Sequence, residues 1–190
     1  MNQGRVTQLK RRTLNREPDV TIQVITNGKQ TELSYLKGLV AEYAQEAAVV
    51  CRKIKFINAA PALLVKKANA MIREGGLDYV YAVSDKDQFD VERALKDRCD
   101  GVNLLISNPC FEIWLLLHFE KCDSAIDGKD RALEKLRKHL SNFDPNNLDY
   151  SNFSPYVHKA AERARQCSEA PRRNPSTTLW QLVDILKPKH

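Results

Sequence analysis

Long hydrophobic runs are missing from this 190-residue sequence. The longest apolar run, Ile113 to Leu117, is far shorter than the roughly 18 to 20 apolar residues that cross a bilayer. We therefore do not expect this chain to be a membrane protein. Glycine and proline number only seven and eight, which argues against a collagen-like or low-complexity chain. The five cysteines are widely spaced and leave at least one unpaired, which predicts a protein of the reducing cytoplasm.

Several short motifs that assign a chemistry are also absent. The sequence has no G-x-G-x-x-G, G-x-x-x-x-G-K-[ST], H-E-x-x-H or C-x-x-C, so nucleotide cradles and cysteine zinc sites lack support. The four histidines are scattered, and we expect His118 to cap a buried helix rather than to bind a metal. Cys110 is expected to be a small buried apolar residue.

The composition and the distribution of charge are informative. With 43% apolar and 28% charged residues, the chain is expected to fold as one domain over residues 19–188. The net charge of +6 lies at the ends, because residues 1–18 and 159–190 each carry +4 and residues 19–158 sum to −2. We expect residues 1–18 to form a basic flexible tail. This pattern favours a phosphate-binding protein whose chemistry uses carboxylates, and the alternative is a solvated tail without a partner.

Hydrophobic periodicity predicts alternating strands and helices in the first part of the chain. Strands are expected at Val20–Thr26, Arg52–Ile57, Asp78–Ser84 and Val102–Ile106, and helices at Thr31 to about Ala48, Pro61 to about Glu74, and Val91–Arg98. This order predicts an α/β fold with an open, mainly parallel sheet and helices on both faces.

The second part of the chain is expected to be helical. Asn108 and Pro109 resemble an N-cap and a first helical residue, which predicts an apolar helix over Cys110–Phe119. Further helices are expected at 130–140, 155–166 and 176–186. From about residue 120 these helices would form an extension packed on the sheet, and they need not form a separate domain.

Asp85 and Asp87 are the most informative candidate site residues. They follow a predicted strand, and ligands of open α/β sheets gather at the carboxyl ends of strands. Two carboxylates at this spacing can approach one hard cation, and Mg²⁺ is commonly held by one or two carboxylates together with waters. The alternative is that the two aspartates serve only the turn.

Three further residues are candidates at neighbouring positions. Asn27 ends the first strand before Gly28, and it would lie near Asp85 if the first and third strands are neighbours; the alternative is a plain turn with glycine at positive φ. Glu32 is either a favourable charge in the first turn of a helix or a third carboxylate of the same cleft. Glu112 is the single charge of an apolar helix and is either functional or a buried structural carboxylate.

Taken together, four segments resemble the RloB-like family. They are Thr26–Gly38, Ser84–Phe89, Ser107–Phe119 with the sequence SNPCFEIWLLLHF, and Asn174–Thr178. The resemblance spans about residues 19–188 and implies a Toprim-related fold. It also implies a partner of the AAA/ABC-type ATPases in bacterial restriction and phage-defence loci.

The Toprim pattern implies specific roles for some of these residues. In that pattern a Glu before Gly ends the first strand as acid/base or metal ligand, and a D-x-D pair binds Mg²⁺ (or Mn²⁺); Asp85 and Asp87 match the pair, whereas Asn27 replaces the Glu. Either Glu32 or Glu112 substitutes, or the protein binds without cutting. The leading hypothesis is therefore a metal-dependent nuclease-like effector acting on DNA or RNA. The alternative is a catalytically weakened module that binds nucleic acid or the ATPase, and assembly as a homo-oligomer stays open.

Overall fold

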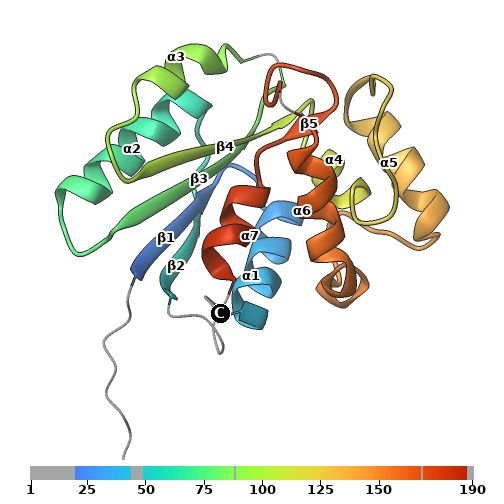
Figure 1. Cartoon of the computed structure of the whole chain (residues 1–190), viewed down its shortest axis with the longest axis horizontal. Coiled ribbons are helices and arrows are strands. Elements are labelled where there is room, and N and C mark those ends of the chain that lie inside the picture. Colours follow the sequence, from blue (N-terminus) through green and yellow to red (C-terminus); the bar gives the residue numbers. More distant parts are fainter. Residues whose placement is uncertain (1–19, 44–48, 88, 168, 188–190) are drawn as a thin grey trace, which may run out of the picture.

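A mixed sheet of five strands forms the centre of the protein (Figure 1). The computed structural model describes residues 20–43, 49–87, 89–167 and 169–187. The strand order is β2-β1-β3-β4-β5; the first four strands run parallel and β5 runs antiparallel to β4. The strands are β1 (Val20–Thr26), β2 (Val49–Phe56), β3 (Tyr79–Asp85), β4 (Val102–Asn108) and β5 (Ser176–Thr177). The predicted open, mainly parallel α/β sheet is confirmed.

Helices cover both faces of this sheet, as predicted. Figure 1 shows α2 (Pro61–Arg73) and α3 (Val91–Lys96) on one side, and α1 (Thr31–Tyr43), α6 (Val157–Arg165) and α7 (Trp180–Leu186) on the other. Successive side chains of β1 point to opposite faces of the sheet: Ile25 packs in the core on the α2 side, whereas Ile22 and Val24 pack in the core on the α1 side. The sheet therefore separates two apolar cores.

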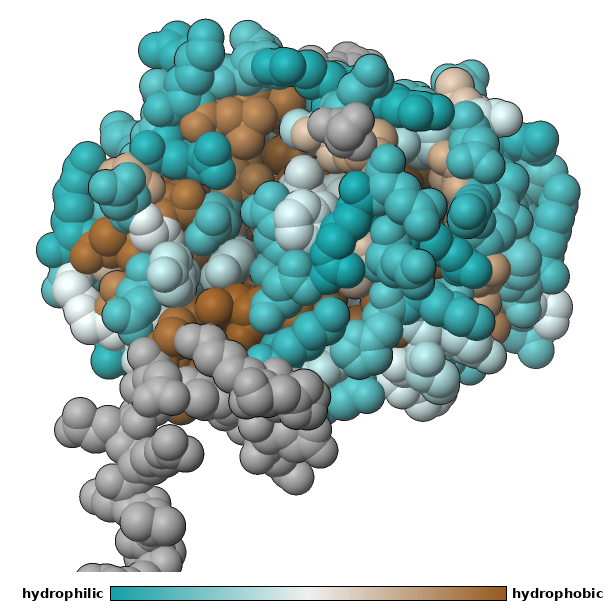
Figure 2. Space-filling view, in the orientation of Figure 1, coloured by the Kyte–Doolittle hydropathy of each residue, from teal (hydrophilic) through white to brown (hydrophobic). Residues whose placement is uncertain are grey.

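The chain beyond residue 120 shares the larger of these cores. Its elements are α5 (Gly128–His139), the 3₁₀ turns Tyr150–Asn152 and Ser154–Tyr156, α6 and α7, and they pack together with α4 (Glu112–Leu116). Phe153, Trp114 and Tyr35 are fully buried at their meeting point. Figure 2 shows hydrophilic side chains over most of the visible face, with apolar patches mainly on its left half, where Figure 1 shows the strands. Within the described ranges, no helix is long and apolar enough to span a membrane.

The segment around Asn108 differs from the prediction. Asn108 belongs to β4, where it pairs with Ser176 of β5, so it is not an N-cap, and α4 begins only at Glu112. The side-chain amide nitrogen of Asn108 lies 2.9 to 3.0 Å from the backbone carbonyl oxygens of residues 171, 172 and 173. Because Ser176 is in a strand, the last helix begins at Trp180 rather than at residue 176. The predicted tail 1–18 and the predicted helical residues 44–48 lie outside the described residues.

Candidate active site

Strands β1 and β3 end side by side, which brings two of the candidate segments together. Thr26 pairs with Val83 in the parallel ladder, and the next residue, Asn27, donates its backbone N–H to the Val83 carbonyl at 3.3 Å. The Asn27 amide also donates to Ser84 Oγ at 2.9 Å. Asn27 therefore lies directly beside the residue that precedes Asp85.

Gly28 provides space for the carboxylate of Glu32. A Cβ atom on Gly28 would lie 1.9 Å from Glu32 Cδ and 2.1 Å from Oε2, so the Glu32 side chain occupies the position that a larger residue 28 would fill. Gly28 does not adopt a positive φ, so the expected conformational reason for a glycine does not apply. Glu32 follows Asn27 by five residues in the chain, yet its side chain extends back so that the carboxylate lies at the end of β1.

Asp85 ends β3 beside this carboxylate. The pKa of Asp85 is raised to about 8. Burial is the largest cause, the negative charges of Glu32 and Glu112 add to it, and Lys129 and the Phe111 N–H oppose the shift. Burial also raises the pKa of Glu32, with Glu112 adding to the effect. Like charges close together cannot all ionise easily, so at neutral pH Asp85 retains a proton in the absence of a further cation.

Glu112 lies at the start of α4 and is completely buried. The Lys129 ammonium, in the first turn of α5, lies 2.9 Å from Glu112 Oε1. Burial alone would lower the pKa of Lys129, but Glu112, Glu32 and Asp85 raise it. Three elements thus contribute three carboxylates and a fourth contributes one ammonium. We call Glu32, Asp85, Glu112 and Lys129 the carboxylate cluster.

Asp87 lies apart from this cluster. It is exposed in the turn after β3, with φ of 42°, and its N–H donates to the Pro109 carbonyl at 3.1 Å. Asp87 is not among the groups that shift the pKa of Asp85. The structure therefore brings Glu32, Asp85 and Glu112 together, with Asn27 beside them, and leaves Asp87 at the rim.

A hollow of about 270 Å³ borders the cluster. Gly28, Glu32 and Lys129 line it, together with Pro145 and Asn146 from the loop after α5. Thr31 Oγ1 donates to the Pro145 carbonyl at 2.7 Å, which fixes this loop to the start of α1. A ligand in the hollow would contact both a carboxylate and an ammonium.

The chemistry of these donors suits a hard divalent cation. Carboxylate oxygens are the ligands that Mg²⁺ takes, and Mg²⁺ needs only one or two of them because it keeps several waters. In the described part of the chain, Glu112 Oε1 pairs with the Lys129 ammonium at 2.9 Å, and the buried Oε2 has no hydrogen-bond partner. No three His, Cys, Asp or Glu side chains of the described ranges form a preformed metal site. The cluster thus has suitable donors, and Lys129 supplies its positive charge.

Two other reactive side chains are accounted for by packing. His118 is buried; its Nδ1 contacts the Trp114 carbonyl and its Nε2 contacts the Tyr35 hydroxyl, both at 2.9 Å. Burial lowers the pKa of His118 to about 3, so the ring is neutral. Burial, followed by Glu112 and Asp85, raises the pKa of the Cys110 thiol far above its usual range. Neither residue is placed as a metal ligand or a nucleophile.

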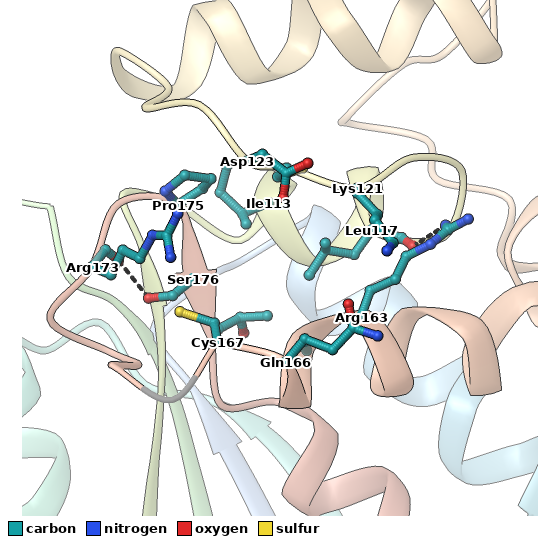
Figure 3. A pocket seen from close by; sticks show the side chains of 13 residues that line it. Ile113, Leu117, Lys121, Asp123, Arg163, Gln166, Cys167, Arg173, Pro175 and Ser176 are labelled. Carbon is teal, nitrogen blue, oxygen red and sulfur yellow. Dashed lines mark hydrogen bonds between the residues drawn. The ribbon is translucent and has the colours of Figure 1, made fainter.

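A second hollow, of about 70 Å³, lies between α4, α6 and the chain before β5 (Figure 3). Figure 3 shows Arg163 extending to the Leu117 carbonyl, which its Nη1 contacts at 2.6 Å. On the opposite side Ser176 Oγ donates to the Arg173 carbonyl, also at 2.6 Å. Arg163 therefore satisfies the end of α4, and none of the predicted site residues lines this hollow.

Sequence reasoning did not identify Lys129. The residue lies at the start of a helix that appeared to be an ordinary amphipathic one, far along the chain from Glu32. The sequence carried no signal for this role, because the predicted helix begins only at residue 130 and Lys129 precedes it. The structure places the Lys129 ammonium 2.9 Å from the buried Glu112 carboxylate.

These features define an open α/β protein with a carboxylate cluster at the carboxyl edge of its parallel strands. The family model described as RloB-like protein matches residues 22–186. The chain belongs to the RloB-like family, as the sequence motifs indicated. Comparisons with curated proteins and with solved structures give no match.

Proposed function

We propose that the protein hydrolyses phosphodiester bonds of nucleic acid in a reaction that depends on Mg²⁺ or Mn²⁺. The observation that carries this proposal is the convergence of Glu32, Asp85 and Glu112 from three elements at the carboxyl ends of the strands. Burial, followed by repulsion from Glu32 and Glu112, raises the pKa of Asp85, and a divalent cation would stabilise the charged carboxylates there. Membership of the RloB-like family supports the same direction through the resemblance to Toprim proteins.

Each residue of the cluster has a distinct proposed role. Asp85, with Glu32 or Glu112, would hold the metal, which when bound polarises a phosphate and lowers the pKa of water. Glu32 takes the role of the glutamate that the Toprim pattern has at the position of Asn27, because the Glu32 carboxylate lies over Gly28 at the end of β1. Lys129 is about half-exposed and borders the hollow, so its ammonium can contact a phosphate oxygen there.

The wider context is part of the proposal. The resemblance supports a role as an effector in bacterial phage defence, together with an AAA/ABC-type ATPase. An ATPase partner would account for a cluster that is largely buried and partly neutralised in the free chain, since binding could change access to it. Whether DNA or RNA is cut is determined by the assay below.

A specific observation favours a second candidate function. Lys129 already lies against Glu112, and Asn27 supplies an amide where the Toprim pattern has a carboxylate. A protein with these two features could bind nucleic acid or its ATPase partner without cleavage. The two functions differ in activity and not in fold.

Cleavage assays separate the two. Wild type is incubated with labelled single- and double-stranded DNA and RNA in Mg²⁺ or Mn²⁺, with and without an ATPase encoded beside it. Hydrolysis that is lost in Asp85→Asn and kept in the matched surface variant Asp100→Asn supports the nuclease. Absence of cleavage by wild type under all these conditions, with binding retained, favours the second function.

A further inference from the structure

Basic side chains collect on a part of the surface that counting charges along the chain did not reveal. Between residues 52 and 74 the sequence has six basic residues and one acidic residue, although residues 19–158 as a whole sum to −2. The basic residues belong to the edge strand β2 and to α2: Arg52, Lys53, Lys55, Lys66, Lys67 and Arg73. The fold therefore segregates charge inside the domain as well as between its ends.

A bulge in β2 helps to expose this charge. Ile22 pairs with Cys51 and Val24 with Ile54, so β2 contains one more residue than β1 between these pairs. A bulge interrupts the alternation of side chains, and both Arg52 and Lys53 are exposed. Charged residues on an edge strand also prevent edge-to-edge pairing, but that need does not explain the lysines of α2.

A groove lies between the β2 edge and α2. Its volume is about 460 Å³, and its lining includes the basic residues Arg52, Lys55 and Lys67 and the apolar residues Met71 and Leu77. The Arg52 guanidinium lies against the turn after α2, where a Cβ on Gly76 would be 3.1 Å from Nη1. The three cations thus face one concave surface.

These cations have no acidic partners in the described ranges of the chain. The ion pairs there involve other basic residues, on α3, α5 and α6, before β5, and immediately after α7. Glu74 is the one acidic residue that lines the groove, and it forms none of these ion pairs. A row of unpaired cations in a groove attracts a polyanion with regularly spaced charges.

The groove also reaches the edge of the sheet at which the carboxylate cluster lies. Ile57 lines the groove and donates its N–H to the Thr26 carbonyl at 2.8 Å. Thr26 immediately precedes Asn27, which lies beside β3 at the site. One end of the groove therefore lies at this edge of the sheet, and its other end, at Gly75 and Leu77, lies just before β3 begins.

We infer that the groove formed by Arg52, Lys55 and Lys67 binds the phosphate backbone of nucleic acid. This inference deepens the proposed function, on which it rests, by naming the surface that holds the substrate. Binding here is electrostatic and independent of base sequence. It does not require the metal.

The test measures binding of fluorescein-labelled oligothymidylate by anisotropy, in EDTA and over a range of salt concentrations, with the full chain. In Arg52→Gln/Lys55→Gln/Lys67→Gln, the slope of log K against log salt is expected to become shallower by about 2 units, because each lost phosphate contact of a single strand removes about 0.7. The control Arg137→Gln/Lys138→Gln/Lys159→Gln removes the same charge from exposed residues of α5 and α6 and should keep the wild-type slope. Lys55→Arg/Lys67→Arg should keep it as well.

Several outcomes overturn the inference. Equal slopes in the groove variant and the control would mean that the groove makes no phosphate contacts. No binding by wild type, or equally salt-dependent binding of polyglutamate through the same three residues, would exclude a nucleic-acid groove. Because these measurements need no cleavage, failure of the groove and failure of the proposed hydrolysis are distinguishable: Asp85→Asn should lose cleavage and keep binding.

Discussion

The stability of the protein should depend on pH through Asp85. Its pKa rises from 3.8 to about 8 on folding, so between these values the folded chain holds a proton that the unfolded chain releases. The free energy of unfolding therefore falls as pH rises through this window, by up to about 1.4 kcal/mol per pH unit. Over about four units this contribution reaches at most about 6 kcal/mol, and it is constant above about pH 9. Asp85→Asn removes the titrating group and keeps an oxygen that can accept the Phe111 N–H.

Urea unfolding in metal-free buffer tests this reasoning. From about pH 5 to about pH 9, Asp85→Asn should become progressively more stable relative to wild type, by several kcal/mol at the upper end. Asp87→Asn is the matched control; Asp87 is exposed and apart from the cluster, so its effect on stability should be small. Stability curves of wild type and Asp85→Asn that run parallel over the whole range would refute the raised pKa.

Three further substitutions test the cluster. Lys129→Met removes the cation beside buried Glu112 and should cost about 1 to 3 kcal/mol of stability at neutral pH, less than for a fully buried pair because Lys129 is half-exposed; an unchanged urea midpoint would contradict the ion pair. Gly28→Ala must displace the Glu32 carboxylate and should weaken Mg²⁺ binding in calorimetry, whereas wild-type affinity would show that Glu32 is not needed. Asn27→Glu adds a carboxylate beside Ser84 and Asp85 and should tighten Mg²⁺ binding in calorimetry, whereas unchanged affinity would show that this position lies outside the metal site.

The sheet could be predicted because its signals are local. Each parallel strand shows an apolar run bounded by turn residues, and the intervening helices show helical spacing, which together define the α/β alternation. Asn108 was misassigned because Asn followed by Pro is also typical of a helix start. Its pairing with Ser176 depends on a residue 68 positions later in the chain, which no local pattern contains.

The candidate site was predictable in part for the same reason. The strand-end position of Asp85 and the single charge Glu112 in an apolar helix were visible in sequence, and β1 and β3 proved to be neighbours. The return of Glu32 over Gly28 and the approach of Lys129 depend on how helices pack at this edge. Spacing alone favoured Asp87 as the second carboxylate, but a turn residue at positive φ directs its side chain by backbone geometry and not by spacing.

A crystal structure of the protein soaked with Mn²⁺ tests the central claim most directly. The anomalous signal of Mn²⁺ identifies the ion independently of any activity. The account predicts manganese bound by Asp85 together with Glu32 or Glu112. Manganese bound elsewhere, or no manganese at the cluster at saturating Mn²⁺, would contradict it.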